Sequence, residues 1–402
     1  MQEQNQPASM PSAASAAWVP SLTSLALAAI APAAALNRLT MPQLLQEIEA
    51  VTDETDPGNL YMRWFYLLSV LGQMSHALEM QAKALSYRQL FRIADPAKLA
   101  VRLLVWMGPG DNLDNLPVDF LVQDSDIRVD LVFVSATEEL PSPLPEHDIC
   151  IVALGESEKN NRLLDRIEQM LQAWPRPCLN HPAAVRRCAR DRAAALLQDI
   201  SGLHMPATVR WQRNAPAPAR FPLTVRPLDT HAGLGLRKID DLPAWQAYLL
   251  EYHACAQFYV AEYVDYRSAD GCFRKYRIAL IEGVPYLCHL AIGEYWLLHY
   301  QSADMAHNPA GRAEEQQVME RFDDDFGQRH SQALRSIAER IGLDYLILDC
   351  GETQSGALLV FEVDNGAWIH DCDAPAVFPY KAAIMAKAFA AFRRMLLRRS
   401  GL

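Results

Sequence analysis

The sequence predicts a protein of mixed α/β and α+β class, in which a helical segment precedes two parts built on β-sheets. Apolar residues recur at helical spacing from 39 to 98, and continuous apolar runs alternate with a helix from 99 to 181. From 182 to 402, helical stretches are mixed with at least five strand patterns. A chain of 402 residues, 50% hydrophobic and 21% charged, has room for two or three domains.

The overall charge and the cysteines narrow the classes of function. The net charge of −11 argues against a general nucleic-acid binder, although local geometry still permits binding of a compact polyanion such as ATP. The eight cysteines are scattered singly without CxxC or CxH spacing, so we expect no zinc site. Scattered reduced thiols are typical of cytoplasmic proteins, and this is the compartment that we expect.

Residues 1–38 form an Ala/Pro-rich arm that we expect to be flexible. No charged residue occurs from 4 to 37, whereas a signal peptide would normally open with positive residues. Pro20 and Pro32 bracket an apolar stretch of only 11 residues, which is too short to span a bilayer. The sequence therefore predicts no membrane association.

Residues 39–98 predict a helical segment. "MPQLLQEIEAV" has helical spacing, and "LYMRWFYLLSVLGQMSHALEMQAKALSYRQLFRIAD" predicts a longer helix pair. Gly72, Ala77 and Ala84 lie where a tetratricopeptide unit places its small residues, and such a unit would bind a protein or peptide partner. One repeat does not bury a continuous core, so a helical cap packed on the next domain is the favoured interpretation.

Residues 99–181 predict a parallel sheet. The strands are expected in "LAVRLLVWMGPGDN", "VDFLV", "VDLVFVSA" and "HDICIVALGES", with a helix at 161–174. The turns "GPGDN" and "LGESEKNN" follow strands, where open α/β sheets usually place ligands. No GxGxxG motif occurs, and "WPRPCLNHPAAV" predicts a linker to the next part.

Residues 182–402 predict an α+β domain. Helices are expected at 183–200, 242–254, 313–341 and 379–399, and strands at 221–228, 257–265, 275–292, 344–349 and 357–364.

The stretch "VFEVDNG" places acids at the end of an apolar strand. Side chains alternate across a strand, so Glu362 and Asp364 point to one face, and Asp349 ends the preceding strand. Mg²⁺ prefers a few carboxylate oxygens together with water and phosphates, which predicts Asp349, Glu362 and either Asp364 or Asn365 as ligands. Asp349 reaches Glu362 only through an asymmetric loop or a strong twist. The alternative is a hairpin end whose acids face water.

Two further stretches have the chemistry of a nucleotide site. Arg226 ends a strand before the loop "DTHAGLG", in which Gly233 and Gly235 would let backbone amides approach phosphate oxygens. Glu262 follows the apolar strand of "FYVAEYVD", where backbone groups can hold an adenine and an acid can accept a proton from its amino group. By themselves these features equally fit a plain turn and an edge strand.

These pieces occur in the order and spacing of the ATP-grasp superfamily, and the sequence resembles its carboxylate–amine ligases over about residues 100 to 385. The resemblance implies an ATP-grasp fold at 182–402 and a Rossmann-like domain before it at 99–181. "RDRAAALLQ" and "VRPLDTHAGLG" match two phosphate-binding motifs, "VAEYVD" matches the adenine hinge, and "KYRIALIEG" matches the strand whose Arg277 faces the phosphates. The implied ATP-binding residues are Arg192, Arg226, His231, Gly233, Gly235, Glu262, Tyr263 and Val264, with Asp265 or Asp270 near the ribose, and the implied Mg²⁺ ligands are Asp349, Glu362, Asp364 and Asn365.

The sequence departs from the family pattern in three places. Arg192 and Arg226 stand where lysines are usual, and arginine keeps the charge but binds phosphate through a planar fork. Asp364 stands where asparagine is usual, with Asn365 beside it. Ile347 replaces an arginine that stabilises the tetrahedral intermediate, a role that Arg277 or Arg312 would then take.

The resemblance implies an ATP-dependent ligase that joins a carboxylate to an amine through an acyl phosphate. Trp296, His299 and Tyr300 would shape the acceptor pocket, with His299 as a base near neutral pH. The segment with His370, Asp371 and Asp373 would attract the amine, or form a solvated loop. The substrates would be small molecules or peptides, and a homodimer is the expected assembly.

Two other hypotheses remain open at this point. One is an ATP-dependent phosphotransferase that uses the same cleft on a hydroxyl or other acceptor. The other is a catalytically silent nucleotide-binding adaptor, in which the helical N-terminus recruits a partner. Product analysis separates the first from a ligase, and nucleotide binding without turnover would indicate the second.

Overall fold

The computed structural model describes residues 17–18, 55–111, 113–123, 125–231, 233–299 and 302–402. The predicted arm therefore lies outside the described residues except for β1 (Ala17–Trp18), as does the predicted helix at 41–51. Among the described residues, no helix combines the length and the apolar run that crossing a membrane requires.

The helix pair predicted near the N-terminus is present as α4 (Pro57–Val70) and α5 (Met74–Tyr87). Asp56 caps α4 by accepting the backbone N–H of Asn59 at 2.9 Å. The turn between the helices contains Gly72 in the left-handed region, with φ of 71°. Ala77, Gln81 and Ala84 are the buried residues of α5, at the spacing of one helix face. The helix pair is thus packed on the sheet that follows.

A six-stranded sheet forms the first part of the fold, in the order β1-β2-β4-β3-β5-β6. Its strands after β1 are β2 (Leu90–Ala94), β3 (Val101–Met107), β4 (Ile127–Phe133), β5 (Ile149–Val152) and β6 (Cys178–Leu179). The predicted parallel pairing is confirmed for β3–β4, β3–β5 and β5–β6, whereas β2 runs antiparallel to β4. The helix α7 (Asn161–Leu171) follows β5 as the sequence predicts.

Three local predictions in this part are wrong. The segment 118–122 was expected to be a strand but forms the short buried helix α6 (Val118–Leu121), which packs against the C-terminal helix. The end of the expected helix pair forms the strand β2 instead. Arg92 of β2 is paired with Asp130 of the neighbouring strand β4, while Phe91 and Ile93 are buried. The expected linker contains the edge strand β6 and the helix α8 (Pro182–Val185).

An antiparallel sheet and a mainly antiparallel sheet, in which β7 runs parallel to its neighbour β15, make up the rest of the fold and agree with the predicted α+β class. A four-stranded sheet has the order β10-β9-β11-β8, and a five-stranded sheet has the order β13-β12-β14-β15-β7. The strands of the smaller sheet are β8 (Thr208–Gln212), β9 (Leu223–Pro227), β10 (Arg237–Ile239) and β11 (Gln257–Glu262). Those of the larger sheet are β7 (Leu203–His204), β12 (Phe273–Ile281), β13 (Val284–Gly293), β14 (Tyr345–Glu352) and β15 (Leu358–Asp364).

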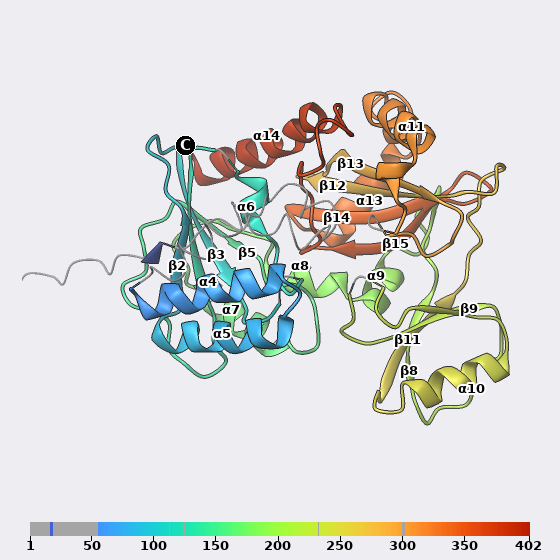
Figure 1. The fold of residues 1–402 in the computed structure, drawn as a ribbon, viewed down its shortest axis with the longest axis horizontal. Coiled ribbons are helices and arrows are strands. Elements are labelled where there is room, and N and C mark those ends of the chain that lie inside the picture. The colour runs from blue at the N-terminus through green and yellow to red at the C-terminus, as the bar shows by residue number, and fades with distance from the viewer. Residues whose placement is uncertain (1–16, 19–54, 112, 124, 232, 300–301) are drawn as a thin grey trace, which may run out of the picture.

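Helices cover these sheets and connect them. The helix α10 (Leu242–Glu251) packs Trp245 and Tyr248 into the core of the four-stranded sheet. The remaining helices are α9 (Arg190–Leu196), α11 (Pro309–Glu320), α12 (Phe326–Arg329), α13 (Ser331–Ile341) and α14 (Lys381–Ser400), with 3₁₀ turns at Arg186–Cys188 and Met305–His307. Figure 1 shows α14 running above the six-stranded and five-stranded sheets, and it contacts strands of both.

Together these layers confirm the predicted α/β and α+β class: two facing, mainly antiparallel sheets are preceded by a mostly parallel sheet. Residues of the six-stranded and five-stranded sheets share continuous hydrophobic cores. The domain boundaries at 38, 98 and 181 stay predictions. A cavity lies between the four-stranded sheet and the five-stranded sheet, and the candidate site is in this cavity.

Candidate nucleotide-binding and catalytic site

A row of polar side chains crosses four strands of the five-stranded sheet. His289 of β13 lies opposite Arg277 of β12, Arg277 opposite Asp349 of β14, and Asp349 opposite Glu362 of β15. Direct cross-strand partners lie on the same face of a sheet. These four residues, drawn from distant parts of the chain, therefore form one line along the floor of the cavity.

Two irregularities in strand pairing create this alignment. The register between β14 and β15 shifts between Asp349 and Cys350, so that Phe361 is the extra residue and Glu362 moves opposite Asp349. A similar shift beside Arg277 brings His289 into the row. The asymmetry that the sequence required for Asp349 to meet Glu362 is thus a β-bulge.

Asp349 is neutralised by two cations. Arg277 donates Nε to its Oδ1 at 2.8 Å and Nη2 to its Oδ2 at 2.9 Å, and Lys275 Nζ lies 2.7 Å from Oδ2. Burial alone would raise the pKa of Asp349, but the charges of Arg277 and Lys275 outweigh it and hold the pKa well below its usual range. Arg277 also donates to the carbonyl oxygen of Trp368 at 2.9 Å, which fixes the loop after β15.

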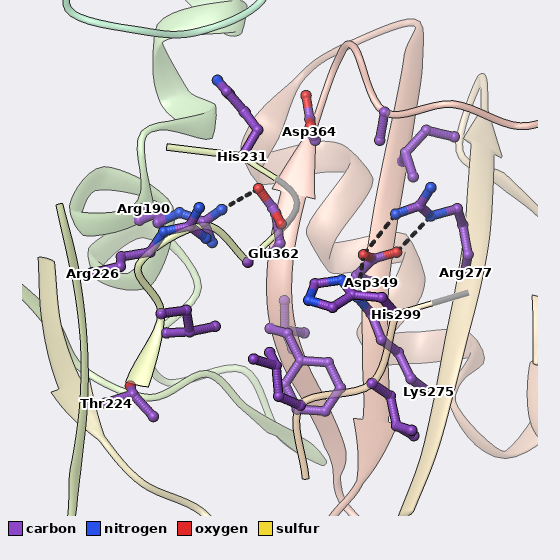
Figure 2. A pocket seen from close by; sticks show the side chains of 18 of the residues that line it. Arg190, Thr224, Arg226, His231, Lys275, Arg277, His299, Asp349, Glu362 and Asp364 are labelled. Carbon is purple, nitrogen blue, oxygen red and sulfur yellow. Dashed lines mark hydrogen bonds and ion pairs between the residues drawn. The ribbon is translucent and has the colours of Figure 1, made fainter. Parts of the chain in front are cut away.

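Glu362 and Asp364 are the other two acids of the predicted cluster, and their environments differ. Glu362 accepts a hydrogen bond from Arg190, and the charges of Arg190 and Arg226 lower its pKa although burial acts in the opposite direction. Burial and the charge of Glu362 raise the pKa of Asp364, which accepts the backbone N–H of Gly366 at 2.7 Å. In Figure 2, Glu362 lies between Arg190 and the Asp349–Arg277 pair.

The oxygen atoms of Glu362 and Asp364 fit a divalent cation that completes its shell with phosphate oxygens and water. Mg²⁺ is usually bound in proteins by one or two carboxylates in this way, and a cation would relieve the repulsion between these two. Among the described residues, no group of three His, Cys, Asp or Glu side chains is arranged to hold a metal by itself. Asn365 is buried, and its Nδ2 donates to the carbonyl oxygen of Leu154 at 3.0 Å.

Arg226 ties the glycine-containing loop to the smaller sheet. Its side chain is only 5% exposed, and it donates to Thr230 Oγ1 at 3.0 Å and to the Thr230 carbonyl oxygen. Burial and the charge of Arg190 lower the pKa of Arg226 to about 9. Gly233 and Gly235 have φ of 73° and 69°, a conformation that favours glycine. This loop places His231 and Gly233 at the cavity.

The segment after β11 forms the other end of the cavity. Glu262, Tyr263 and Val264 line it, together with Met205 and Leu359. The carboxylate of Glu262 lies 3.0 Å from His204 Nε2 and is therefore engaged by that imidazole. The backbone N–H and C=O groups of this segment are then the groups that could bind an adenine. The apolar lining suits the flat face of a base.

His299 lies where the glycine loop meets the segment after β13. A Cβ atom added to Gly233 would stand 2.2 Å from His299 Nε2, so imidazole and loop are in close contact. Burial and the charge of Lys275 lower the pKa of His299, which keeps the imidazole neutral at neutral pH. Trp296 also lines the cavity, whereas Tyr300 lies outside the described residues.

Several residues predicted from the sequence lie away from the cavity lining. Arg192 is exposed, because it lies two positions beyond Arg190 and points to another face of α9. Asp265 is paired with Arg267, and Asp270 with Arg274. Arg312 donates to backbone carbonyls of Met305 and Ala306, and the Gly235 carbonyl accepts from the Tyr248 hydroxyl at 2.8 Å.

Arg190, Lys275 and His289 are among the cavity residues that the sequence did not predict. Arg190 was passed over because the family motif pointed to the position two residues later. Lys275 shares a strand face with Arg277, so the alternation of side chains was a usable signal. His289 becomes adjacent only through the bulge beside Arg277, which no sequence pattern indicates.

The lining residues enclose one continuous cavity of about 720 Å³. This volume is within the range of about 300–1,000 Å³ that is typical of small-molecule sites. Its cations and acids lie in the middle, with apolar residues of the β11 end on one side and the loop after β15 on the other.

Comparison with known proteins adds a likeness of fold. No protein-family model and no curated protein matches this chain. D-alanine–D-alanine ligase from Bacillus anthracis, solved in complex with ATP, is similar at 13% identity and a TM-score of 0.47, over 75% of this chain and 97% of that one. The VanG D-Ala:D-Ser ligase from Enterococcus faecalis has 12% identity and a TM-score of 0.46, over 74% and 99% of the two chains. A RimK domain ATP-grasp protein from Sphaerobacter thermophilus has 15% identity and a TM-score of 0.43, over 72% and 98%.

Proposed function

We propose that this protein is an ATP-dependent ligase that joins a carboxylate to an amine through an acyl phosphate. The observation that carries the proposal is the cavity itself, in which Arg190 and Arg226 lie on one side of Glu362 and Lys275 is paired with Asp349 on the other, with Asp364 further along the strand of Glu362. Cations beside paired carboxylates are suited to a magnesium-bound polyphosphate. The cations would balance the negative charge of the phosphates, and the carboxylates would balance the positive charge of Mg²⁺.

Each part of the cavity has a role in this proposal. The segment 261–264 holds the adenine through its backbone, and Arg190 and Arg226 neutralise the phosphates. When bound between Glu362 and Asp364, Mg²⁺ would withdraw charge from the phosphoryl group being transferred. The glycine-containing loop, fixed by Arg226 at Thr230, covers the phosphates and excludes water.

The reaction needs no nucleophilic side chain. The substrate carboxylate takes the γ-phosphoryl group and ADP leaves, and the amine then attacks the acyl carbon, loses a proton and expels phosphate. His299 lines the cavity and is neutral near pH 7, because its pKa is lowered, and we assign it the role of accepting that proton. Arg277 is held by Asp349 and by the carbonyl of Trp368, so it orients the carboxylate side of the site rather than moving freely.

The test is release of ADP and phosphate by purified protein with Mg²⁺, ATP and mixtures of carboxylates and amines. We expect ADP release that depends on both substrates, and at least a 100-fold loss in Glu362→Gln. Arg237→Ala is the matched control, because Arg237 is a surface residue paired with Glu251 outside the cavity.

The products separate the competing hypotheses. An amide product with free phosphate supports the ligase, and a stable phosphorylated acceptor would show a phosphotransferase. Nucleotide binding without turnover, across all mixtures, would identify a silent nucleotide-binding adaptor and overturn the proposal.

A further inference from the structure

Part of the cavity lining comes from residues to which the proposed function assigns no contact with the nucleotide. We call it the acceptor compartment, and its walls are Ser69, Met74, Asp111, Leu113, Trp368 and His370. Along β15 the lining passes from Val360 at the adenine end, through Glu362 and Asp364, to the loop at 367–373. The strand therefore orders the cavity from base to phosphates to this compartment.

The α4–α5 helix pair supplies one wall of the compartment directly. Ser69 lies in the last turn of α4 and Met74 is the first residue of α5, on either side of the Gly72 turn. Figure 1 shows this turn at the end of the helix pair that faces α8 and the five-stranded sheet. Ser69 donates its hydroxyl to the Phe65 carbonyl oxygen at 2.8 Å, so its contribution to the wall is small size rather than a polar contact.

The helix pair also fixes a second wall. The buried side chain of Gln81 donates to the Gly110 carbonyl oxygen at 2.9 Å and accepts the Gly110 N–H at 2.8 Å. These two hydrogen bonds hold the loop after β3, which carries Asp111 and Leu113 into the compartment. The opposite wall contains Trp368, whose carbonyl oxygen accepts a hydrogen bond from Arg277. This bond holds the loop after β15 against the row of polar side chains.

Asp111 is the acidic residue among the named walls of this compartment. Asp111 accepts the backbone N–H of Leu113 at 2.7 Å, and within the described residues it forms no ion pair with a cation. Met74, Leu113 and Trp368 make the rest of the wall apolar. An acidic group beside an apolar wall is complementary to a primary amine that carries an apolar side chain.

We propose that the α4–α5 helix pair forms the amine-binding wall of the cavity and selects a small amine whose apolar side chain packs on Met74 and Trp368, with its amino group toward Asp111. The inference rests on the proposed function and names the acceptor class for the same cavity. It assigns the N-terminal helices to substrate selection within the chain.

The experiment compares Met74→Trp, which fills the compartment, with Leu78→Trp on the exposed face of the same helix. The probes are glycine, alanine, leucine, phenylalanine and the corresponding alkylamines, tested with MgATP and a mixture of carboxylates. We expect Met74→Trp to raise the KM of the larger amines at least tenfold and to shift preference toward glycine and methylamine. The KM for ATP should stay within twofold, and Leu78→Trp should retain the wild-type profile.

A binding readout separates failure of this inference from failure of the proposed function. In saturating MgADP, the same amines should raise the melting temperature of the wild type and of Leu78→Trp but not of Met74→Trp, whether or not turnover occurs. Met74→Ala, which enlarges the compartment, guards against a folding defect and should favour the larger amines. Identical amine profiles in Met74→Trp and Leu78→Trp, or no amine binding to the wild type, would overturn the inference. Amine binding without any ADP release would instead reject only the ligase reaction.

Discussion

At the residue scale, three neighbouring acids are held in different electrostatic states. Asp349 has two cationic partners, Glu362 has Arg190, and Asp364 has the negative charge of Glu362 beside it. The pKa of Asp349 is therefore lowered and that of Asp364 is raised, although both belong to one predicted ligand set. Asp349 is thus neutralised within the structure, whereas Asp364 carries a repelled negative charge, which is why we propose it as a ligand of a cation.

This difference predicts opposite effects of two matched substitutions on stability. Asp349→Asn leaves the buried charges of Arg277 and Lys275 unpaired, and should cost about 3–5 kcal/mol of unfolding free energy at pH 7. Asp364→Asn removes a repelled carboxylate and should raise the denaturation midpoint at pH 7 while weakening Mg²⁺-dependent nucleotide binding. Urea denaturation without nucleotide, and nucleotide titration with and without Mg²⁺, measure both.

The pH dependence of these effects follows from the direction of each pKa shift. For Asp349 the folded pKa is lowered, so its contribution is present above the ordinary pKa of about 4 and is lost as the pH falls below it. For Asp364 the folded pKa is raised, so its penalty is present at neutral pH and disappears as the pH falls through the raised value toward about 4. Equal destabilisation by both substitutions at pH 7 would contradict this electrostatic description.

At the element scale, two glycines in different turns, Gly235 and Gly356, have backbone conformations that other residues adopt poorly. Gly235 has φ of 69°, and a Cβ there would lie 2.7 Å from Pro227 Cδ. Gly356 has φ of 81° in the turn between β14 and β15, with no atom near its Cβ position. The two glycines therefore share the conformational requirement but not the crowding.

Gly235→Ala should weaken nucleotide binding at least tenfold, because the loop must shift away from Pro227. Gly356→Ala is the control: its left-handed conformation should cost about 1–2 kcal/mol of stability, with nucleotide affinity unchanged. Titration calorimetry gives the affinity, and thermal denaturation gives the stability. Unchanged affinity in Gly235→Ala would show that this loop does not hold the phosphates.

Much of this element-level arrangement was predictable from the sequence, and the failures have physical causes. The α+β class, the strand carrying Glu362 and the helix pair follow from local periodicity. The helix at 118–121 was taken for a strand because a four-residue buried segment has no measurable period. The family motif pointed to Arg192, whereas α9 begins at Arg190 and it is Arg190 that lines the cavity.

The site required information that lies between elements. From the sequence, Asp349 could meet Glu362 only through an asymmetric loop or a strong twist, and the bulge at Phe361 that brings them together depends on pairing across the sheet. The same holds for His289, whose position is set by the shift beside Arg277. The side chain of Gln81 bonds to the backbone of Gly110, in a distant segment. Every residue has such backbone groups, so the residue types do not predict which segments are joined in this way.

At the scale of the whole molecule, the C-terminal helix α14 joins the six-stranded and five-stranded sheets through a shared hydrophobic core. Phe392 of α14 is fully buried and packs edge-on against Tyr345 of β14 at a ring separation of 5.5 Å. The hydrophobic core that contains them also includes residues of β3 and β4. The floor of the cavity and the sheet that carries Asp111 are thus stabilised by the same helix.

Phe392→Ala should destabilise both sheets together by about 3–5 kcal/mol, the usual cost of removing a buried phenylalanine ring. Hydrogen exchange across a urea series should show peptides of β3 and β14 losing protection at one shifted midpoint. Lys387→Ala, on the exposed face of α14, should leave the midpoint unchanged. Separate midpoints for the two sheets in the wild type would contradict a shared core.

The central proposal is that Glu362 and Asp364 bind a divalent cation that is also coordinated by the phosphates of a nucleoside triphosphate. A crystal structure with Mn²⁺ and a non-hydrolysable ATP analogue tests it most directly, because the anomalous signal of manganese locates the ion without reference to the protein. We expect a peak within coordination distance of both carboxylates, with the phosphates beside Arg190 and Arg226 and the base at 261–264. A nucleotide bound elsewhere, or bound in this cavity with no manganese peak at either carboxylate, would contradict the proposal.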